Sequence, residues 1–333
     1  MKDITRDVTL EFVRVTEAAA LKASRWMGKG NKENADQAAV DAMRGALDFV
    51  AVRGTVVIGE GEKDKAPMLY VGEKVGGGGI YDPEVDIAVD PLDGTTLTSK
   101  GLPNAISVIA VSDSGTIRAL PSYYVEKLAV GPVAKGKIDI NAPPEENLKR
   151  VAKAFGLHIS ELTVVILDRP RHNDLVMRVR KAGARCKLIS DGDVSGAISA
   201  AIEESGVNML MGIGGSAEGV LAAAALKCLG GEIQVKMVPR DDAERQKLAD
   251  LGLADFDTVF GTEDLAKGSS TIFSATGVTG GDFLPGVRYE GNTAITHSVV
   301  MRARTCTVRY IKAIHNLDIK TIRSRSSGQE VGI

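Results

Sequence analysis

The sequence predicts a protein of the mixed α/β and α+β class, with an α+β half over residues 1–160 and an α/β half over residues 161–333. Two observations support this. After two helical segments, the first half contains short β-branched runs separated by turn residues, whereas strands and helices alternate in the second half. A chain of 333 residues with 44% hydrophobic residues is long enough to bury two such cores.

The first half is expected to begin with two helices. Apolar residues recur at helical spacing over residues 5–27, and a second helix is expected to begin near Asn34, after the glycine-rich stretch GKGNK. The strands of a largely antiparallel sheet are expected at 55–58, 85–89, 105–111, 116–120 and 123–130. The tetraglycine segment 76–79 is interpreted as a flexible connection.

The second half alternates between strand and helix, which is typical of βαβ units around a parallel sheet. The expected strands are TVVILD, CKLIS and NMLMGI, and the expected helices begin near residues 171, 193 and 220. Residues 141–156 are expected to form the passage between the halves. After residue 285 the pattern again predicts strands, which are expected to rejoin one of the sheets.

Charge and cysteine content exclude several classes of protein. Lys plus Arg number 41 and Asp plus Glu number 43, so the net charge of −2 gives no basic surface for nucleic acid or for a membrane. Three separated cysteines argue against a disulfide framework or a structural zinc site. The first residues, MKDITRDVTLEFV, have no apolar signal core, and no apolar run is long enough to span a bilayer. We therefore expect a cytoplasmic protein.

Several acidic residues fall where an expected strand ends or an expected helix begins. They are Asp36, Glu60, Asp90, Asp93 and Glu218. For Asp36 the alternative is an ordinary helix cap, and for the Asp90/Asp93 pair it is a cap on a helix that begins near Thr95. Pro91 fixes the backbone between the paired carboxylates and Gly94 permits a close approach, so both side chains would project from one rigid turn.

Carboxylates without histidine or cysteine partners favour a hard metal ion. Oxygen ligands suit Mg²⁺ or Mn²⁺, and the four histidines show no spacing typical of a zinc site. Paired ions of this kind commonly serve phosphoryl transfer, in which they stabilise both the attacking and the leaving oxygen. The hydroxyls of Thr95 and Thr96 are placed to orient a water molecule.

Two other functions are compatible with parts of the sequence. In GIGGSAEG, the residues Gly212, Gly214 and Ala217 match the dinucleotide pattern G-x-G-x-x-A, with Glu232 downstream, as in a nicotinamide-dependent oxidoreductase. The chain could also be a metal-dependent binding protein without catalytic activity, because a fold does not fix a function.

The segment DPLDGTT resembles the DPxDGT element of the lithium-sensitive, magnesium-dependent phosphatases, which include inositol monophosphatases and fructose bisphosphatases. ADQAAVDAMR, VVIGEGEKDKAPMLYVGE, YYVEKLAVGPVAKGKIDI, LDRPRH, LISDGDV and GIGGSAEGVLAAAAL together resemble one branch, the bacterial class II fructose-1,6-bisphosphatases. The resemblance spans nearly the whole chain with the motifs in order. It implies a layered αβαβα sugar-phosphatase sandwich.

The resemblance also implies roles for individual residues. It assigns metal binding to Asp36, Glu60, Asp90, Asp93 and Glu218. Thr95 would polarise the attacking water, together with Asp36 and with Asp90, which would bridge two ions. The implied substrate contacts are Asp93, Gly94, Thr95, Tyr124, Arg169, Pro170, Arg171, Asp191, Gly192, Asp193 and Gly215. The arginines and Tyr124 would hold the phosphate that is not cleaved, and Asp191 and Asp193 would accept hydrogen bonds from sugar hydroxyls.

The implied reaction is hydrolysis of the 1-phosphate of fructose 1,6-bisphosphate to fructose 6-phosphate and phosphate, in gluconeogenesis or central sugar metabolism. It would use water activated by two or more Mg²⁺ or Mn²⁺ ions and form no covalent phosphoenzyme. Sedoheptulose 1,7-bisphosphate, an inositol phosphate or another sugar phosphate remain alternative substrates. The resemblance further implies a homodimer or homotetramer.

Overall fold

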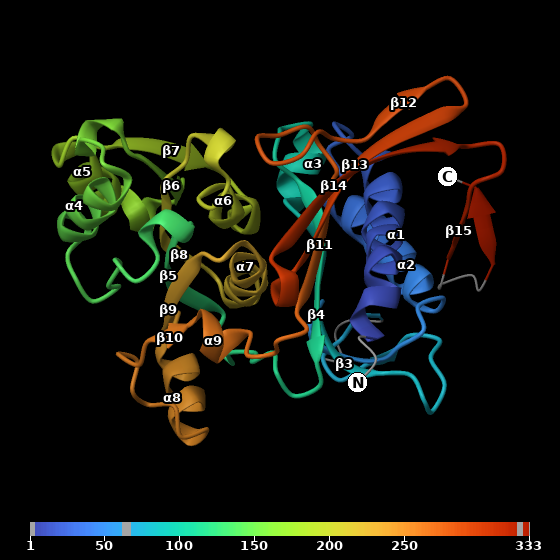
Figure 1. The fold of residues 1–333 in the computed structure, drawn as a ribbon, viewed down its shortest axis with the longest axis horizontal. Helices are drawn as coiled ribbons and strands as arrows, with labels where there is room; N and C mark the ends of the chain where they lie inside the picture. Colours follow the sequence, from blue (N-terminus) through green and yellow to red (C-terminus); the bar gives the residue numbers. More distant parts are fainter. Residues whose placement is uncertain (1–3, 62–67, 325–328, 333) are drawn as a thin grey trace. The chain divides into compact units, whose positions relative to one another are not determined.

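The computed structural model describes residues 4–61, 68–324 and 329–332 (Figure 1). The chain divides into two compact units, one formed by residues up to 117 together with those from 268 onward, and the other by residues 118–267. This corrects the expected halves 1–160 and 161–333. The reason is strand pairing: the strand over residues 124–130 pairs with strands further along the chain, at 209–215 and 232–238.

The first unit contains most of the expected N-terminal helices and strands, with the C-terminal strands added. Its helices are α1 (Ile4–Ser24), α2 (Lys32–Leu47) and α3 (Thr95–Lys100). Its strands are β1 (Arg53–Ile58), β2 (Lys74–Val75), β3 (Glu84–Asp93), β4 (Ile106–Asp113), β11 (Ile272–Gly277), β12 (Arg288–Glu290), β13 (Thr293–Arg302), β14 (Thr307–Asn316), β15 (Thr321–Arg323) and β16 (Glu330–Gly332).

Within the described ranges, this unit has an eight-stranded sheet in the order β12-β13-β11-β4-β3-β1-β2, with β14 paired to β13. The pairs are antiparallel except β1 with β3, which confirms the expected sheet and the return of the last strands. Helices α1 and α2 pack on one face (Figure 1). Their apolar residues, including Phe12, Leu21 and Met43, are fully buried there.

The strand expected at 116–120 does not form. Only Ile117 makes an isolated bridge, and the segment leads from β4 into the second unit. The backbone N–H groups of Thr116 and Ile117 donate instead to Oδ2 of the buried Asp86, at 2.8 and 3.0 Å. A side chain therefore satisfies the backbone that a neighbouring strand was expected to pair.

The tetraglycine segment 76–79 is a packed segment rather than a flexible connection. The backbone N–H groups of Gly77 and Gly78 donate to the carbonyls of Val50 and Val52, at 2.9 and 3.1 Å. A Cβ added at Gly76 would lie 2.1 Å from the carbonyl oxygen of Val52. These glycines are required because the two backbone segments approach too closely for side chains.

The second unit is a helix–sheet–helix arrangement. Its helices are α4 (Pro144–Phe155), α5 (Asn173–Lys181), α6 (Asp193–Ser199), α7 (Ser216–Leu229), α8 (Asp242–Asp250) and α9 (Thr262–Leu265). Its strands are β5 (Tyr124–Val130), β6 (Thr163–Leu167), β7 (Arg185–Ile189), β8 (Met209–Gly215), β9 (Glu232–Val238) and β10 (Phe260–Gly261). The described strands form a six-stranded sheet in the order β10-β9-β5-β8-β6-β7.

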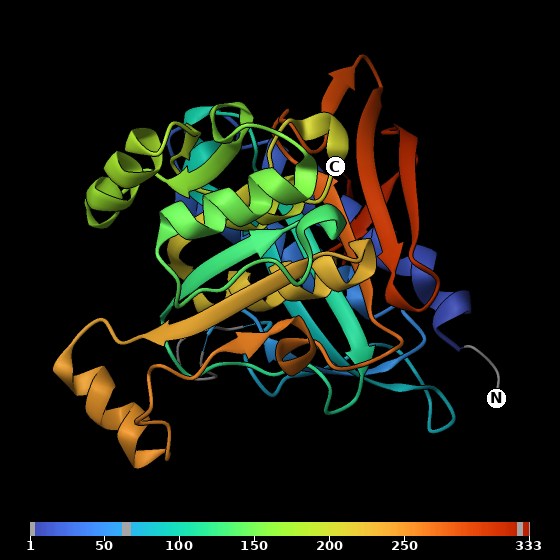
Figure 2. The same ribbon diagram turned by 60° about the vertical axis from the view of Figure 1, so that its left-hand side comes forward.

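The predicted alternation of strands and helices is confirmed in β6, β7 and β8, which run parallel. β5 is antiparallel to both of its neighbours, so the sheet as a whole is mixed. Helices α4 and α5 lie on one face, which is the near face in Figure 2, and α6 and α7 lie on the other. Segment 141–156 is therefore no passage between units, because Leu148 and Val151 of α4 lie in the core of this one.

The two units together confirm the predicted mixed α/β and α+β class, with a helical layer against one sheet and helices on both faces of the other. Across the part of the chain that the structure describes, no helix is both long and apolar enough to cross a bilayer.

Candidate active site

The segment DPLDGT forms the end of β3 in the first unit. Asp90 pairs with Val108 and Asp93 pairs with Ile106, so a β-bulge at Pro91 and Leu92 interrupts the register with β4. The side-chain Oδ1 of Asp90 accepts a hydrogen bond from the backbone N–H of Leu92, at 3.0 Å. The bulge changes the direction of the strand and presents carboxylates from both of its sides.

Helix capping does not account for the acidic residues of this unit. Helix α3 begins at Thr95 with Gly94 as its N-cap, and no side chain caps it. Gly94 has a φ of 101°, in the left-handed region that favours glycine. Helix α2 is capped by Asn31, whose side chain accepts from the N–H of Asn34, and Asp36 follows within the helix. The expected start of this helix near Asn34 is two residues late, because Asn34 is the partner of the cap.

Glu60 follows β1, and Asp90 lies at the corresponding position of the neighbouring parallel strand β3. Ile58 of β1 pairs with Ala88 of β3, and each acidic residue comes two positions later in its strand direction. Burial, together with the negative charge of Asp36, raises the pKa of Glu60 to about 7. Burial raises the pKa of Asp36 as well. The end of β1 and the first turns of α2 thus bring carboxyl groups close enough to repel one another.

A divalent cation fits this donor set, because it would relieve the repulsion between Asp36 and Glu60 and replace the water lost on burial. Apart from residues 1–3, 62–67, 325–328 and 333, no cluster of three or more His, Cys, Asp or Glu side chains has the arrangement of a metal site. The predicted metal ligands fall in both units, four of them in the first, and Glu218 lies in the second. Their joint role therefore stays a prediction.

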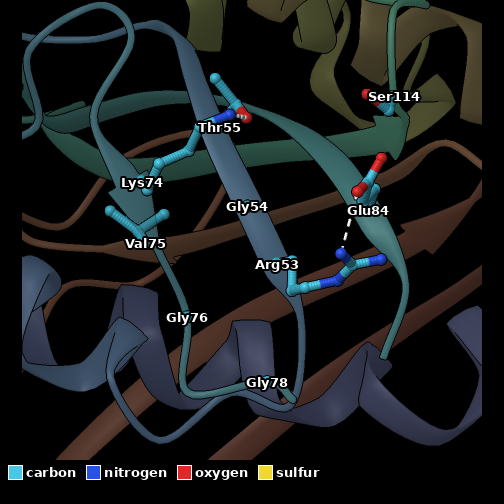
Figure 3. Close-up of a pocket in the computed structure, with 9 residues that line it drawn as sticks. All are labelled: Arg53, Gly54, Thr55, Lys74, Val75, Gly76, Gly78, Glu84 and Ser114. Atoms are coloured by element: carbon cyan, nitrogen blue, oxygen red, sulfur yellow. Dashed lines mark hydrogen bonds and ion pairs between the residues drawn. The ribbon is translucent and has the colours of Figure 1, made fainter. Parts of the chain in front are cut away.

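A surface hollow of about 410 Å³ lies at the other end of the same strands (Figure 3). Arg53 and Glu84, the first residues of β1 and β3, line it and form an ion pair at 3.0 Å. The amine of Lys74 donates to the hydroxyl of Thr55 at 2.7 Å. No predicted site residue lines this hollow, so it is separate from the carboxylate group at the strand ends.

In the second unit, a buried ion pair joins the middle of a strand to the start of a helix. The amine of Lys127 on β5 lies 2.7 Å from Oδ2 of Asp193, the first residue of α6, and their side chains are 2% and 7% exposed. Burial raises the pKa of Glu218 on α7, and the positive charge of Lys127 opposes this rise. Asp193 and Asp191 add to it. The buried lysine therefore pairs with Asp193 and also favours the charged form of Glu218.

The glycines of GIGG make room for these carboxylates. A Cβ added at Gly214 would lie 1.9 Å from Oδ2 of Asp193, and one at Gly215 would lie 1.9 Å from Oε2 of Glu218. Real Cβ atoms do not approach other atoms so closely. The end of β8 is therefore bare backbone against which Asp193 and Glu218 pack.

We expect Gly214→Ala to lower the free energy of unfolding by about 1–3 kcal/mol, because the new methyl must displace a buried ion pair. Denaturant unfolding followed by circular dichroism would measure the change. Gly261→Ala is a suitable control, since its Cβ would lie 3.6 Å from the nearest atom and its φ is −91°. Equal stability of the two variants would contradict the packing role of Gly214.

The arginine loop, defined as residues 169–171, follows β6 and forms part of a short 3₁₀ helix (Pro170–His172). The guanidinium of Arg171 donates from Nη2 and Nε to the carbonyl of Ile213 on β8, at 2.7 and 3.2 Å. It also lies over the ring of Tyr124, with Cζ 5.1 Å from the ring centroid. Arg169 donates to the carbonyl of Asp168, at 3.0 Å. Tyr124, Arg171 and β8 therefore form one connected group.

The dinucleotide interpretation of GIGGSAEG finds no support in this geometry. Glu232 would have to follow a strand, but it is the first residue of β9, and its Oε2 accepts from the N–H of Gly136 at 2.5 Å. The glycines that match the pattern instead accommodate Asp193 and Glu218.

Sequence reasoning missed Lys127 and His172. Lys127 lies on the same buried face of β5 as Val125 and Ala129, because the three residues are two positions apart. A lysine between two apolar residues of one strand face therefore indicated a buried charge. His172 is 3% exposed and directly follows the arginine loop.

Known proteins resemble this chain over nearly its whole length. A family model for bacterial fructose-1,6-bisphosphatase, glpX-encoded, matches residues 6–315. A D-fructose 1,6-bisphosphatase class 2/sedoheptulose 1,7-bisphosphatase from Synechococcus sp. (strain JA-2-3B'a(2-13)) is 45% identical over 93% of this chain and 95% of its own length. A fructose-1,6-bisphosphatase class 2 from Haemophilus influenzae is 44% identical over 95% of this chain and 98% of its own.

Proposed function

The chain belongs to the bacterial class 2 fructose-1,6-bisphosphatase family, and we propose on this basis that it hydrolyses the 1-phosphate of fructose 1,6-bisphosphate, with Mg²⁺ or Mn²⁺ as its cofactor. Enzymes of this family are metal-dependent phosphatases. The observation that carries the proposal is the bulged end of β3, which presents Asp90 and Asp93 directly before Thr95, the first residue of α3.

In the proposed site, Asp36, Glu60, Asp90, Asp93 and Glu218 would hold the metal ions. When bound, the ions supply charge neutralisation for the phosphoryl oxygens and lower the pKa of water. The hydroxyl of Thr95 would orient the attacking water, and it would itself donate a hydrogen bond to the carboxylate of Asp36. Because the water attacks phosphorus directly, no protein nucleophile is required.

The proposed substrate contacts divide according to the bonds that each residue already makes. Arg171 directs two of its nitrogens to the carbonyl of Ile213, so Arg169 is the better candidate for a forked contact with the phosphate that is not cleaved. Asp193 uses Oδ2 for Lys127, which leaves Oδ1 for a sugar hydroxyl. Tyr124 is exposed and can donate from its phenol.

A second substrate is favoured by a specific observation. Two of the similar proteins, both from Synechococcus, carry names that include sedoheptulose 1,7-bisphosphatase, at 45% and 44% identity. Sedoheptulose 1,7-bisphosphate presents the same 1-phosphate on a sugar one carbon longer. We therefore include it as a competing substrate.

The test is phosphate release by the purified protein from fructose 1,6-bisphosphate, with Mg²⁺, with Mn²⁺ and after EDTA. We expect one phosphate per sugar, fructose 6-phosphate as the other product, and loss of at least about 10³-fold in rate after EDTA that added metal restores. Sedoheptulose 1,7-bisphosphate and inositol 1-phosphate, assayed in parallel, rank the substrates. A folded, metal-loaded protein that releases no phosphate from any of them would contradict the proposal.

Assembly as a homodimer or homotetramer, with a sugar bisphosphate as the small-molecule partner, completes the proposal. Light scattering of the purified protein tests the state of assembly, and a monomeric mass would contradict it.

A further inference from the structure

His172 lies directly between the arginine loop and α5, with 3% of its surface exposed. Its Nδ1 is 2.7 Å from the carbonyl oxygen of Leu167, the last residue of β6, and the backbone N–H of Ile213 on β8 points to its Nε2 at 2.7 Å. A carbonyl can only accept and an N–H can only donate. The imidazole must therefore carry its proton on Nδ1 and leave Nε2 bare.

Within the described part of the chain, strand β8 is paired with a strand on only one side at the point where His172 contacts it. On one side β5 pairs with β8 along its length, from Met209 to Gly215. On the other side the pairing with β6 ends at Leu210. Beyond that position the side chains of His172 and Arg171 take the N–H and the carbonyl of Ile213, respectively. Two consecutive side chains thus replace a neighbouring strand.

The fit of the imidazole against β8 is close. Gly212 has a φ of 126°, and a Cβ added there would lie 2.9 Å from Nε2 of His172. Burial lowers the pKa of His172, and the nearby positive charges of Arg171 and Arg169 lower it further. The carbonyl of Leu167 and the charge of Asp193 oppose this. The neutral ring that the two hydrogen bonds require is therefore the form present at neutral pH.

We propose that His172 is a positioning residue for substrate binding, which fixes the arginine loop between the end of β6 and Ile213 of β8 and so places Arg169 and Arg171 for the phosphate that is not cleaved. We call the two hydrogen bonds of His172, to Leu167 and to Ile213, the clamp. The role of His172 in substrate binding rests on the proposed function, whereas the clamp does not. Because the ring is buried and both of its nitrogens are engaged by backbone, His172 is not a proton donor to the leaving group.

Two variants separate the two hydrogen bonds. His172→Asn places an amide near the position of Nδ1 and keeps the bond to Leu167, whereas His172→Gln places one near Nε2 and keeps an acceptor for Ile213. We expect His172→Asn to raise KM for fructose 1,6-bisphosphate about tenfold, and His172→Gln about threefold or less, with kcat changed less than about threefold in both. His158→Asn, at an exposed histidine of the same unit, is the matched control.

Two further readouts do not depend on the reaction. Imidazole ¹⁵N shifts of the wild-type protein should show His172 protonated on Nδ1, and hydrogen exchange of peptides covering 209–215 should be faster in His172→Asn than in His172→Gln. An imidazole protonated on Nε2, or equal exchange in the two variants, would overturn the clamp. A fall in kcat with KM unchanged would overturn the role in substrate binding. If the wild type hydrolyses no sugar bisphosphate, the proposed function fails while the exchange and tautomer results still decide the clamp.

Discussion

Asp90→Asn is expected to lower kcat with fructose 1,6-bisphosphate by at least about 10³-fold while the protein stays folded. The expected loss is large because the asparagine removes a negative charge from the centre of the proposed metal site. The fold should persist because Oδ1 of the amide can still accept the hydrogen bond that Asp90 accepts from the N–H of Leu92, at 3.0 Å. The bulge at the end of β3 therefore keeps its geometry.

Phosphate release and thermal unfolding, measured on the same preparations, test this result. Glu84→Gln is the matched control, because Glu84 begins the same strand at its other end and is 62% exposed in its ion pair with Arg53. We expect that variant to retain near wild-type activity. More than a few per cent of wild-type turnover in Asp90→Asn would rule out the proposed role.

Lys127→Met should lower the free energy of unfolding by about 3–5 kcal/mol, because it leaves the carboxylate of Asp193 buried without its cation. The two side chains are only 2% and 7% exposed and 2.7 Å apart, so water cannot replace the missing charge. The repulsion of Glu218 by Asp193 and Asp191 would then no longer be opposed by the charge of Lys127.

Urea unfolding measures the effect, and a double-mutant cycle with Asp193→Asn isolates the pair. We expect the double variant to be more stable than Lys127→Met alone, because it carries no unpaired charge at this position. Lys236→Met is the matched control: Lys236 lies on the neighbouring β9 and pairs with the exposed Asp257, so its loss should cost about 1 kcal/mol or less. A decrease in the free energy of unfolding of less than about 1 kcal/mol in Lys127→Met would contradict a stabilising role for the ion pair.

Periodicity predicted elements well where the local pattern alone decides structure. Helix α1 and strands β1, β4 and β6 lie close to their expected ranges, since apolar residues at a constant interval bury one face whatever the partner. The prediction of a strand at 116–120 was wrong because the N–H groups of Thr116 and Ile117 donate to Asp86, which lies thirty residues before Thr116 in the chain. Local sequence carries no information about a partner at that distance.

The domain boundary failed for the same reason. Nothing within YYVEKLAV indicates that β5 pairs with strands beginning at Met209 and Glu232 rather than with β4. The interpretation of the tetraglycine segment was wrong because composition cannot distinguish a glycine needed for close packing from one that gives flexibility.

The site itself was predicted to different depths. Placing Asp90 and Asp93 at a rigid strand end followed from Pro91 and Gly94, and the bulge confirms that arrangement. Helix capping, the alternative role for Asp36 and for the Asp90/Asp93 pair, could be excluded only from the structure, because it depends on which residue begins each helix. The parity of Lys127 in its strand could have indicated a buried lysine, but the partners of Lys127 and His172 could not be predicted, since Asp193 and Ile213 are 66 and 41 positions away in the chain.

The second unit is an insertion, and this affects the order in which a ribosome completes the protein. Residues 118–267 emerge as one stretch whose ends are joined by the hydrogen bond from Arg118 to the carbonyl of Leu265, so this unit has all of its strands before synthesis ends. Strand β4 keeps one edge unpaired until its partner β11 has been synthesised, about 160 residues later. Nascent chains that stall after residue 267 should therefore hold a folded second unit and an aggregation-prone amino-terminal segment.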